Sequence, residues 1–251
     1  MKIKMERLKI NLFIKRDILT ANEYISFCKK VIYSLQRIAP IFNIVETWDD
    51  ENAQIFRFND DLSNFNEDNL KVIINEDGEL AYKNDVESDK MLGINSTSWM
   101  GFSSTFSFGK EDVLKNKSVS ISIRHGAYDK KQFSIIKVEF SELYQKDYVD
   151  KNYIIRVLRL LESQVEIEFA NVISNPLFLR FRKKHNFTIG WINYINNTTV
   201  VKHLNEDDIC YISEKGVIFS ISDQFPNIDD DIINKTIQLR DELIRFNYLS
   251  K

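Results

Sequence analysis

Two short runs of β-branched and aromatic residues, at positions 209–212 and 217–221, flank a polar turn that contains Gly216. Such runs joined by a short turn predict an antiparallel hairpin. Just upstream, Ile189, Trp191 and Asn193 alternate with residues that would face the other side of a sheet, and this alternation predicts a neighbouring strand. Residues 187–222 are therefore expected to form antiparallel sheet.

Further alternating segments predict strands over 1–14, 54–58, 99–108, 119–125 and 133–140, the last three as an antiparallel meander, with most of 41–89 as surface loop. Helices are predicted after the Thr20/Glu23 capping box, from about Asp150, and after the acidic run 229–231. The predicted fold class is α+β, with an antiparallel sheet or sheets and about three main helices packed on one side. We expect either one domain over 1–251 or two halves, a strand–helix–meander over 1–145 and a helix–hairpin–helix over 146–251.

Composition excludes several classes of protein. With 251 residues and 43% hydrophobic content, the chain can bury a large core without disulfides or structural metals. Cys28 and Cys210 are expected to be buried free thiols, because neither has a ligand-spaced partner. The charged amino terminus lacks the apolar centre of a secretory signal, and no long apolar run predicts a membrane span, so we expect a cytoplasmic protein. The net charge of −3 does not favour nucleic acid as a partner.

Candidate catalytic groups are few. His125 follows Arg124 at a predicted strand end, and the sequence assigns it no Ser, Cys or carboxylate partner, so a surface histidine is expected. Glu166 and Glu168 would share an exposed strand face. The segment from Arg180 to His185 is basic with interleaved aromatic residues, a composition that can bind nucleic acid. No catalytic, cofactor or metal motif accompanies these groups, so a binding protein is predicted rather than an enzyme.

The carboxy-terminal part resembles a known family. The elements that match are Leu160-Leu161-Glu162-Ser163, Phe169-Ala170-Asn171-Val172, the Gly190-Trp191-x-x-Tyr194 core, the hairpin and the closing helix, over residues 147–249. In these features the chain is similar to the Immunity protein 52 type of bacterial polymorphic-toxin systems. The resemblance implies a cytoplasmic α+β protein without activity of its own that binds and neutralises a cognate toxin, often a nuclease. It implies no catalytic residues and no cofactor.

An inhibitor of a nuclease-type toxin would meet a cationic cleft, so exposed carboxylates are the expected contacts. Three acidic groups and one adjacent aromatic residue qualify as partner-binding residues: Trp48, Asp49, Asp50 and Glu51, then Asp60 and Asp61, then Glu206, Asp207 and Asp208. The alternative for each group is an ordinary solvated loop. The alternative function is an enzyme or a binding protein for a small molecule or nucleic acid that uses His125 or the Arg180 to His185 segment.

Overall fold

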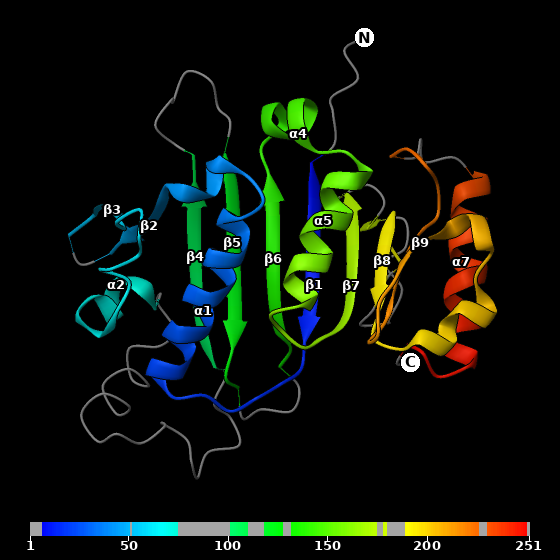
Figure 1. Cartoon of the computed structure of the whole chain (residues 1–251), viewed down its shortest axis with the longest axis horizontal. Coiled ribbons are helices and arrows are strands. Elements are labelled where there is room, and N and C mark those ends of the chain that lie inside the picture. The colour runs from blue at the N-terminus through cyan, green and yellow to red at the C-terminus, as the bar shows by residue number, and fades with distance from the viewer. Residues whose placement is uncertain are drawn as a thin grey trace.

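The computed structural model describes residues 7–50, 52–74, 101–109, 118–127, 132–174, 178–179, 189–225 and 230–249. Within these ranges the strands belong to one ten-stranded sheet (Figure 1). In chain order they are β1 (Leu8–Ile14), β2 (Val45–Asp49), β3 (Gln54–Arg57), β4 (Phe102–Phe108), β5 (Val119–His125), β6 (Ser134–Phe140), β7 (Ile167–Ser174), β8 (Ile192–Ile195), β9 (Ile209–Ile212) and β10 (Val217–Ser220).

The strand order across the sheet is β3-β2-β4-β5-β6-β1-β7-β8-β10-β9, and every pairing is antiparallel. The predicted antiparallel sheet, the β4–β6 meander and the β9–β10 hairpin are therefore confirmed. The first strand lies in the middle, where Ile10 is aligned with Val138 on β6 and with Val172 on β7. The amino-terminal strand thus joins the meander to the carboxy-terminal strands by hydrogen bonds.

The helices and 3-10 turns lie between these strands and after them. They are α1 (Ala21–Gln36), η1 (Pro40–Asn43), η2 (Glu67–Asn69), α2 (Leu70–Ile73), α4 (Glu142–Tyr148), α5 (Lys151–Glu162), η4 (Thr198–His203), η5 (Glu206–Asp208) and α7 (Asp230–Arg245). The predicted capping box is present, because Thr20 and Glu23 exchange both hydrogen bonds at the start of α1. The Asp150 side chain caps α5 with a single bond, by accepting from the Tyr153 amide.

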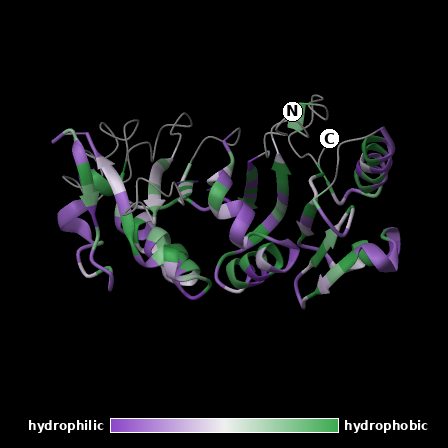
Figure 2. Cartoon of the chain, turned by 90° about the horizontal axis from the view of Figure 1, so that it is seen from above, coloured by the Kyte–Doolittle hydropathy of each residue, from purple (hydrophilic) through white to green (hydrophobic). Residues whose placement is uncertain are grey.

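Two long helices cover one face of the sheet, and a third covers the other. On the first face, the ring centroid of Tyr24 on α1 lies 5.2 Å from that of Phe102 on β4. The hydroxyl of Tyr194 on β8 donates a hydrogen bond to Glu162 of α5. Ile173 of β7 points to the opposite face, where its apolar neighbours Ile233 and Ile237 belong to α7. Figure 2 shows α7 on the far side of the sheet from α1 and α5. The prediction of three main helices on one side is thus corrected: β7 is buried on both faces, so both faces need cover.

Residues 41–50 and 52–74 are structured, which corrects the prediction that most of 41–89 is surface loop. Phe58 and Phe65 are fully buried, and their rings lie 4.7 Å apart beside Phe106 of β4. Burying such rings stabilises the fold by about 1.5–3 kcal/mol each, which outweighs the weak strand signal of the polar residues between them. The edge hairpin β2–β3 is anchored in this way to the core.

Close packing explains the Gly-Trp-x-x-Tyr segment. A Cβ at Gly190 would lie 2.3 Å from the carbonyl oxygen of Val172, so only glycine fits beside β7. The Asn193 side chain brackets the same residue, accepting from the Gly190 amide at 2.7 Å and donating to its carbonyl at 2.9 Å. Trp191 is buried and donates its indole N–H to the Ser222 carbonyl. This segment is therefore a structural centre rather than a surface for a ligand.

Candidate functional site

The β2–β3 hairpin exposes an apolar pair at one edge of the sheet. Trp48 and Ile55 are aligned across the two strands, and they are 50% and 52% exposed. Aligned residues on one face of a hairpin lie within side-chain contact, so the two form one continuous apolar patch. Because β3 is the terminal strand among the described residues, this patch lies beside an edge that has no further strand. We call Trp48 and Ile55, with the turn that follows Trp48, the edge-hairpin surface.

The carboxylates next to Trp48 differ in their roles. Asp49 is only 4% exposed, and its oxygens accept from the backbone and side-chain nitrogens of Asn52 at 3.2 and 2.8 Å. Asp49 therefore holds the turn, unlike the surface carboxylate that the sequence suggested. Asp50 is exposed beside it, and Glu51 lies outside the described residues. Among the described residues of this turn, Asp50 is thus the acidic group that a partner can reach.

Asp60 and Asp61 are exposed in the loop that follows β3. Two hydrogen bonds from α1 hold this loop in place. The Tyr33 hydroxyl donates to the Asp61 carbonyl, and the Gln36 side-chain amide donates to the Asp60 carbonyl. The Ser63 side chain and amide, which bond the Asp61 carboxylate, hold the pKa of Asp61 below its usual value. Two charges are therefore presented on an ordered loop at the same edge of the sheet.

The third acidic group lies at the opposite edge. Glu206 and Asp207 are exposed, whereas Asp208 accepts a hydrogen bond from Lys235 of α7 at 2.9 Å and is half-buried. This group immediately precedes β9, the last strand in the order, whereas the edge-hairpin surface lies on β2 and β3. With strands about 4.8 Å apart, the two groups are separated by roughly 40 Å. The predicted residues therefore form two surfaces rather than one site.

His125 is buried rather than exposed at a strand end. It is 3% exposed, its Nδ1 lies 2.9 Å from Oγ of Ser134, and its ring centroid lies 4.7 Å from that of Phe27. Burial lowers the pKa of His125 to about 4, against the smaller opposing effect of Asp17. The partner, Ser134, could not be assigned from the sequence and is equally buried. The hydrogen bond between the two side chains therefore joins β5 to β6. The predicted surface histidine is therefore a core residue.

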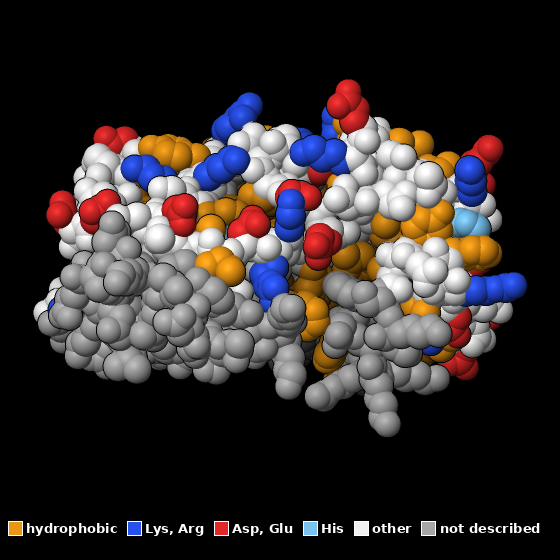
Figure 3. Space-filling model, turned by 90° about the horizontal axis from the view of Figure 1, so that it is seen from below, with side chains coloured by type: hydrophobic (Ala, Val, Ile, Leu, Met, Phe, Trp, Pro, Cys, Tyr) orange, Lys and Arg blue, Asp and Glu red, His pale blue; other side chains and the backbone are white. Residues whose placement is uncertain are grey.

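Other expected sites are limited by what the structure describes. The basic segment from Arg180 to His185 lies outside the described residues. In the described ranges no group of three or more His, Cys, Asp or Glu side chains is arranged to hold a metal ion. None of the described helices is long and apolar enough to cross a membrane. Seen from below, the acidic and basic side chains of the described residues are interspersed (Figure 3).

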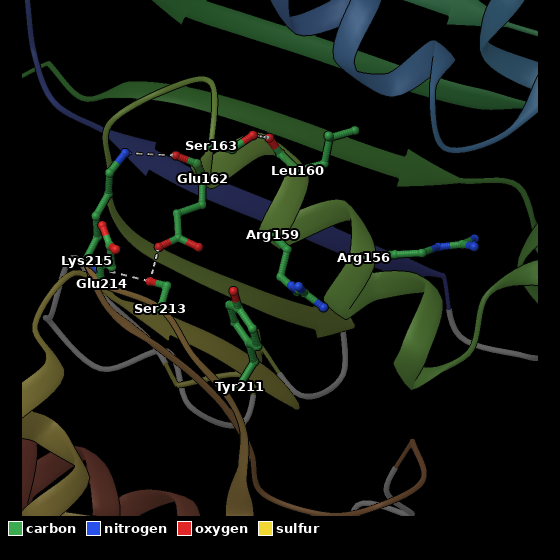
Figure 4. A pocket seen from close by; sticks show the side chains of 9 residues that line it. All are labelled: Arg156, Arg159, Leu160, Glu162, Ser163, Tyr211, Ser213, Glu214 and Lys215. Carbon is green, nitrogen blue, oxygen red and sulfur yellow. Dashed lines mark hydrogen bonds between the residues drawn. The ribbon is translucent and has the colours of Figure 1, made fainter.

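A cleft that the sequence analysis missed lies between the end of α5 and the β9–β10 turn (Figure 4). Its volume is about 770 Å³. We call it the α5–hairpin cleft, and its lining residues are Arg156, Arg159, Leu160, Glu162, Ser163, Tyr211, Ser213, Glu214 and Lys215. Two of its members interact with rings: the Arg159 guanidinium lies 4.0 Å from the Tyr211 ring centroid, and Arg156 lies 5.8 Å from that of Tyr153. Charged groups of both signs therefore converge on one open cavity.

Comparison with known proteins identifies no family. No protein-family model matches the chain, and no curated protein matches it. Among solved structures, a T6SS protein of Pseudomonas aeruginosa is similar, with a TM-score of 0.43 and 13% sequence identity over 93% of this chain and 72% of that chain. A likeness this weak has no bearing on function, so function is inferred from the chain's own surfaces.

Proposed function

We propose that this chain is a binding protein that neutralises a partner protein by occupying it, as an immunity protein does with a cognate bacterial toxin. The single observation behind the proposal is the edge-hairpin surface, where Trp48 and Ile55 are half-exposed as an aligned pair on an edge hairpin. Tryptophan is the residue type most enriched among the anchors of protein interfaces, and an edge strand can accept a strand of another chain.

Exposed charges at this edge of the sheet define the chemistry of the partner. Asp50 lies in the hairpin turn, and Asp60 and Asp61 lie on the loop that follows β3. Exposed carboxylates at the same edge of the sheet as an apolar anchor speed association with a basic surface and disfavour an acidic one. The partner is therefore a protein with a basic surface around an apolar pocket, and a toxin that acts on nucleic acid has this chemistry.

Rescue and complex formation test the proposal together. The chain is co-expressed with the product of the neighbouring gene, growth is measured, and the two proteins are co-purified. We expect growth to be restored and a stable complex to be isolated. The same assay with Trp48→Ala and Ile55→Ser, checked by circular dichroism for an intact fold, should give neither. Absence of both rescue and complex for the unaltered chain would refute the proposal.

A further inference from the structure

The α5–hairpin cleft contains two opposite charges that do not meet. Arg159 and Glu162 are three residues apart in α5, a spacing that brings Cβ atoms to about 5–6 Å and favours direct ion pairs. Neither residue forms an ion pair with any residue in the described part of the chain. The Arg159 guanidinium and the Glu162 carboxylate are therefore neighbours on α5 that do not form an ion pair with each other.

Each charge is held by its own partners. Glu162 is 5% exposed, and its Oε1 accepts the hydroxyls of Tyr194, at 3.1 Å, and of Ser213. Its Oε2 has no hydrogen bond to a described residue, and Glu162 lines the cleft. One carboxylate oxygen is thus fixed by the scaffold, and the other remains available to accept a donor.

Arg159 is held through its face rather than its edge. Its guanidinium lies over the Tyr211 ring, an arrangement that leaves the N–H donors at the rim of the guanidinium free to bind a planar anion through two parallel bonds. Figure 4 shows the Arg159 head group on one side of Tyr211 and the Glu162 carboxylate, bonded to Ser213, on the other, whereas Arg156 points away from both. The two charges therefore line one cleft on either side of the Tyr211 hydroxyl.

We propose that this cleft binds a small zwitterion of the α-amino acid class. The ligand carboxylate would accept two N–H bonds from Arg159, and its ammonium group would donate to Oε2 of Glu162. A ligand with both charges pairs with both Arg159 and Glu162, whereas a simple anion or cation leaves one of the two without a partner. The cavity is within the size range of small-molecule sites and leaves room for a ligand side chain.

Isothermal titration of the purified full chain tests the proposal, with each proteinogenic L-amino acid as a probe. At least one amino acid should bind, and its N-acetylated form and its carboxamide should each bind about tenfold or more weakly, because each lacks one charge. A peptide that ends in the same residue is a second probe. Its carboxy terminus has the same carboxylate, but an uncharged amide N–H replaces the ammonium group. If that peptide bound more tightly than the free amino acid, the zwitterion proposal would be overturned.

Substitutions assign the contacts. Arg159→Gln should weaken binding of the amino acid by about tenfold or more, and Glu162→Gln should abolish the preference over the N-acetylated form while its amide oxygen still accepts from Tyr194 and Ser213. Arg37→Gln and Glu67→Gln, made at exposed positions on other elements, are matched controls and should bind as the unaltered chain does. Binding of no amino acid, or binding by both cleft variants that equals that of the unaltered chain, would overturn the proposal.

Discussion

The hydroxyl of Tyr194 on β8 donates a hydrogen bond to Oε1 of Glu162 at the end of α5, over 3.1 Å. Both side chains are buried, so the bond joins helix to sheet within the core. Burial and the nearby Glu162 charge raise the pKa of Tyr194 well above its usual value, so the phenol stays protonated as a donor. The same bond fixes the Glu162 carboxylate in the α5–hairpin cleft.

Tyr194→Phe should therefore lower the free energy of unfolding by about 1.5–3 kcal/mol, the range for a bond to a charged group, because Glu162 keeps only Ser213 as a partner. Urea unfolding followed by circular dichroism measures the change. Tyr211→Phe is the matched control, since the Tyr211 hydroxyl has no hydrogen bond to a described residue. A loss of equal size in both variants would contradict the assigned role of the bond.

Acid should destabilise the chain through His125. Its native pKa of about 4 is below the ordinary 6.5, so the unfolded state takes up the proton first as the pH falls. The contribution of His125 to stability is complete above pH 6.5 and is lost between 6.5 and 4. The loss is on the order of 3 kcal/mol. Urea unfolding curves at several pH values measure this loss, which should be absent in His125→Gln. His203→Gln is the control, at a histidine whose side chain is 20% exposed, and it should show the same loss as the unaltered chain.

Gly190→Ala should lower the melting temperature markedly. The added methyl would lie 2.3 Å from the Val172 carbonyl, so β7 and the segment before β8 must separate. We expect a loss of about 2–3 kcal/mol, toward the upper end for overpacking in a core. Thermal unfolding followed by circular dichroism measures it, with Lys202→Ala at an exposed position as the control. An unchanged melting temperature would show that the backbone at Gly190 is less confined than described.

Local patterns were sufficient for the elements whose period is visible in the sequence. The Thr20/Glu23 capping box and the alternation of β5 are complete within a few residues, and both are confirmed. The first strand of the hairpin at the edge, β2, was missed because Glu46 and Asp49 interrupt its apolar character. It pairs with β3, the other strand of the hairpin, and with β4, which lies more than 50 residues later in the chain.

The candidate sites depend even more on contacts between distant residues. The spacing of Arg159 and Glu162 is visible in the sequence, and alone it predicts an ordinary ion pair. What separates the two charges is Tyr194 and Ser213, which lie 32 and 51 residues beyond Glu162, together with the Tyr211 ring. Periodicity gives no signal for such contacts, so the cleft could not be predicted.

At the edge-hairpin surface, Trp48→Ala should weaken binding of the partner by at least 2 kcal/mol, about thirtyfold, if Trp48 is the anchor of the interface. The free energy of unfolding should change by less than about 0.5 kcal/mol, as is usual at exposed positions, because the side chain is 50% exposed in the free chain. Surface plasmon resonance and urea unfolding separate the two effects. A large loss of stability with unchanged affinity would show that Trp48 is structural.

Charge reversal distinguishes the two acidic surfaces. The double variant Asp60→Lys with Asp61→Lys should slow association with the partner by about tenfold at low ionic strength, because electrostatic steering acts on the rate of encounter. The double variant Glu206→Lys with Asp207→Lys changes the net charge equally, but at the opposite edge of the sheet. It should leave the association rate within about twofold, and the effect of the first variant should shrink as salt is added. Equal slowing by both would show that net charge, rather than the acidic loop that follows β3, attracts the partner.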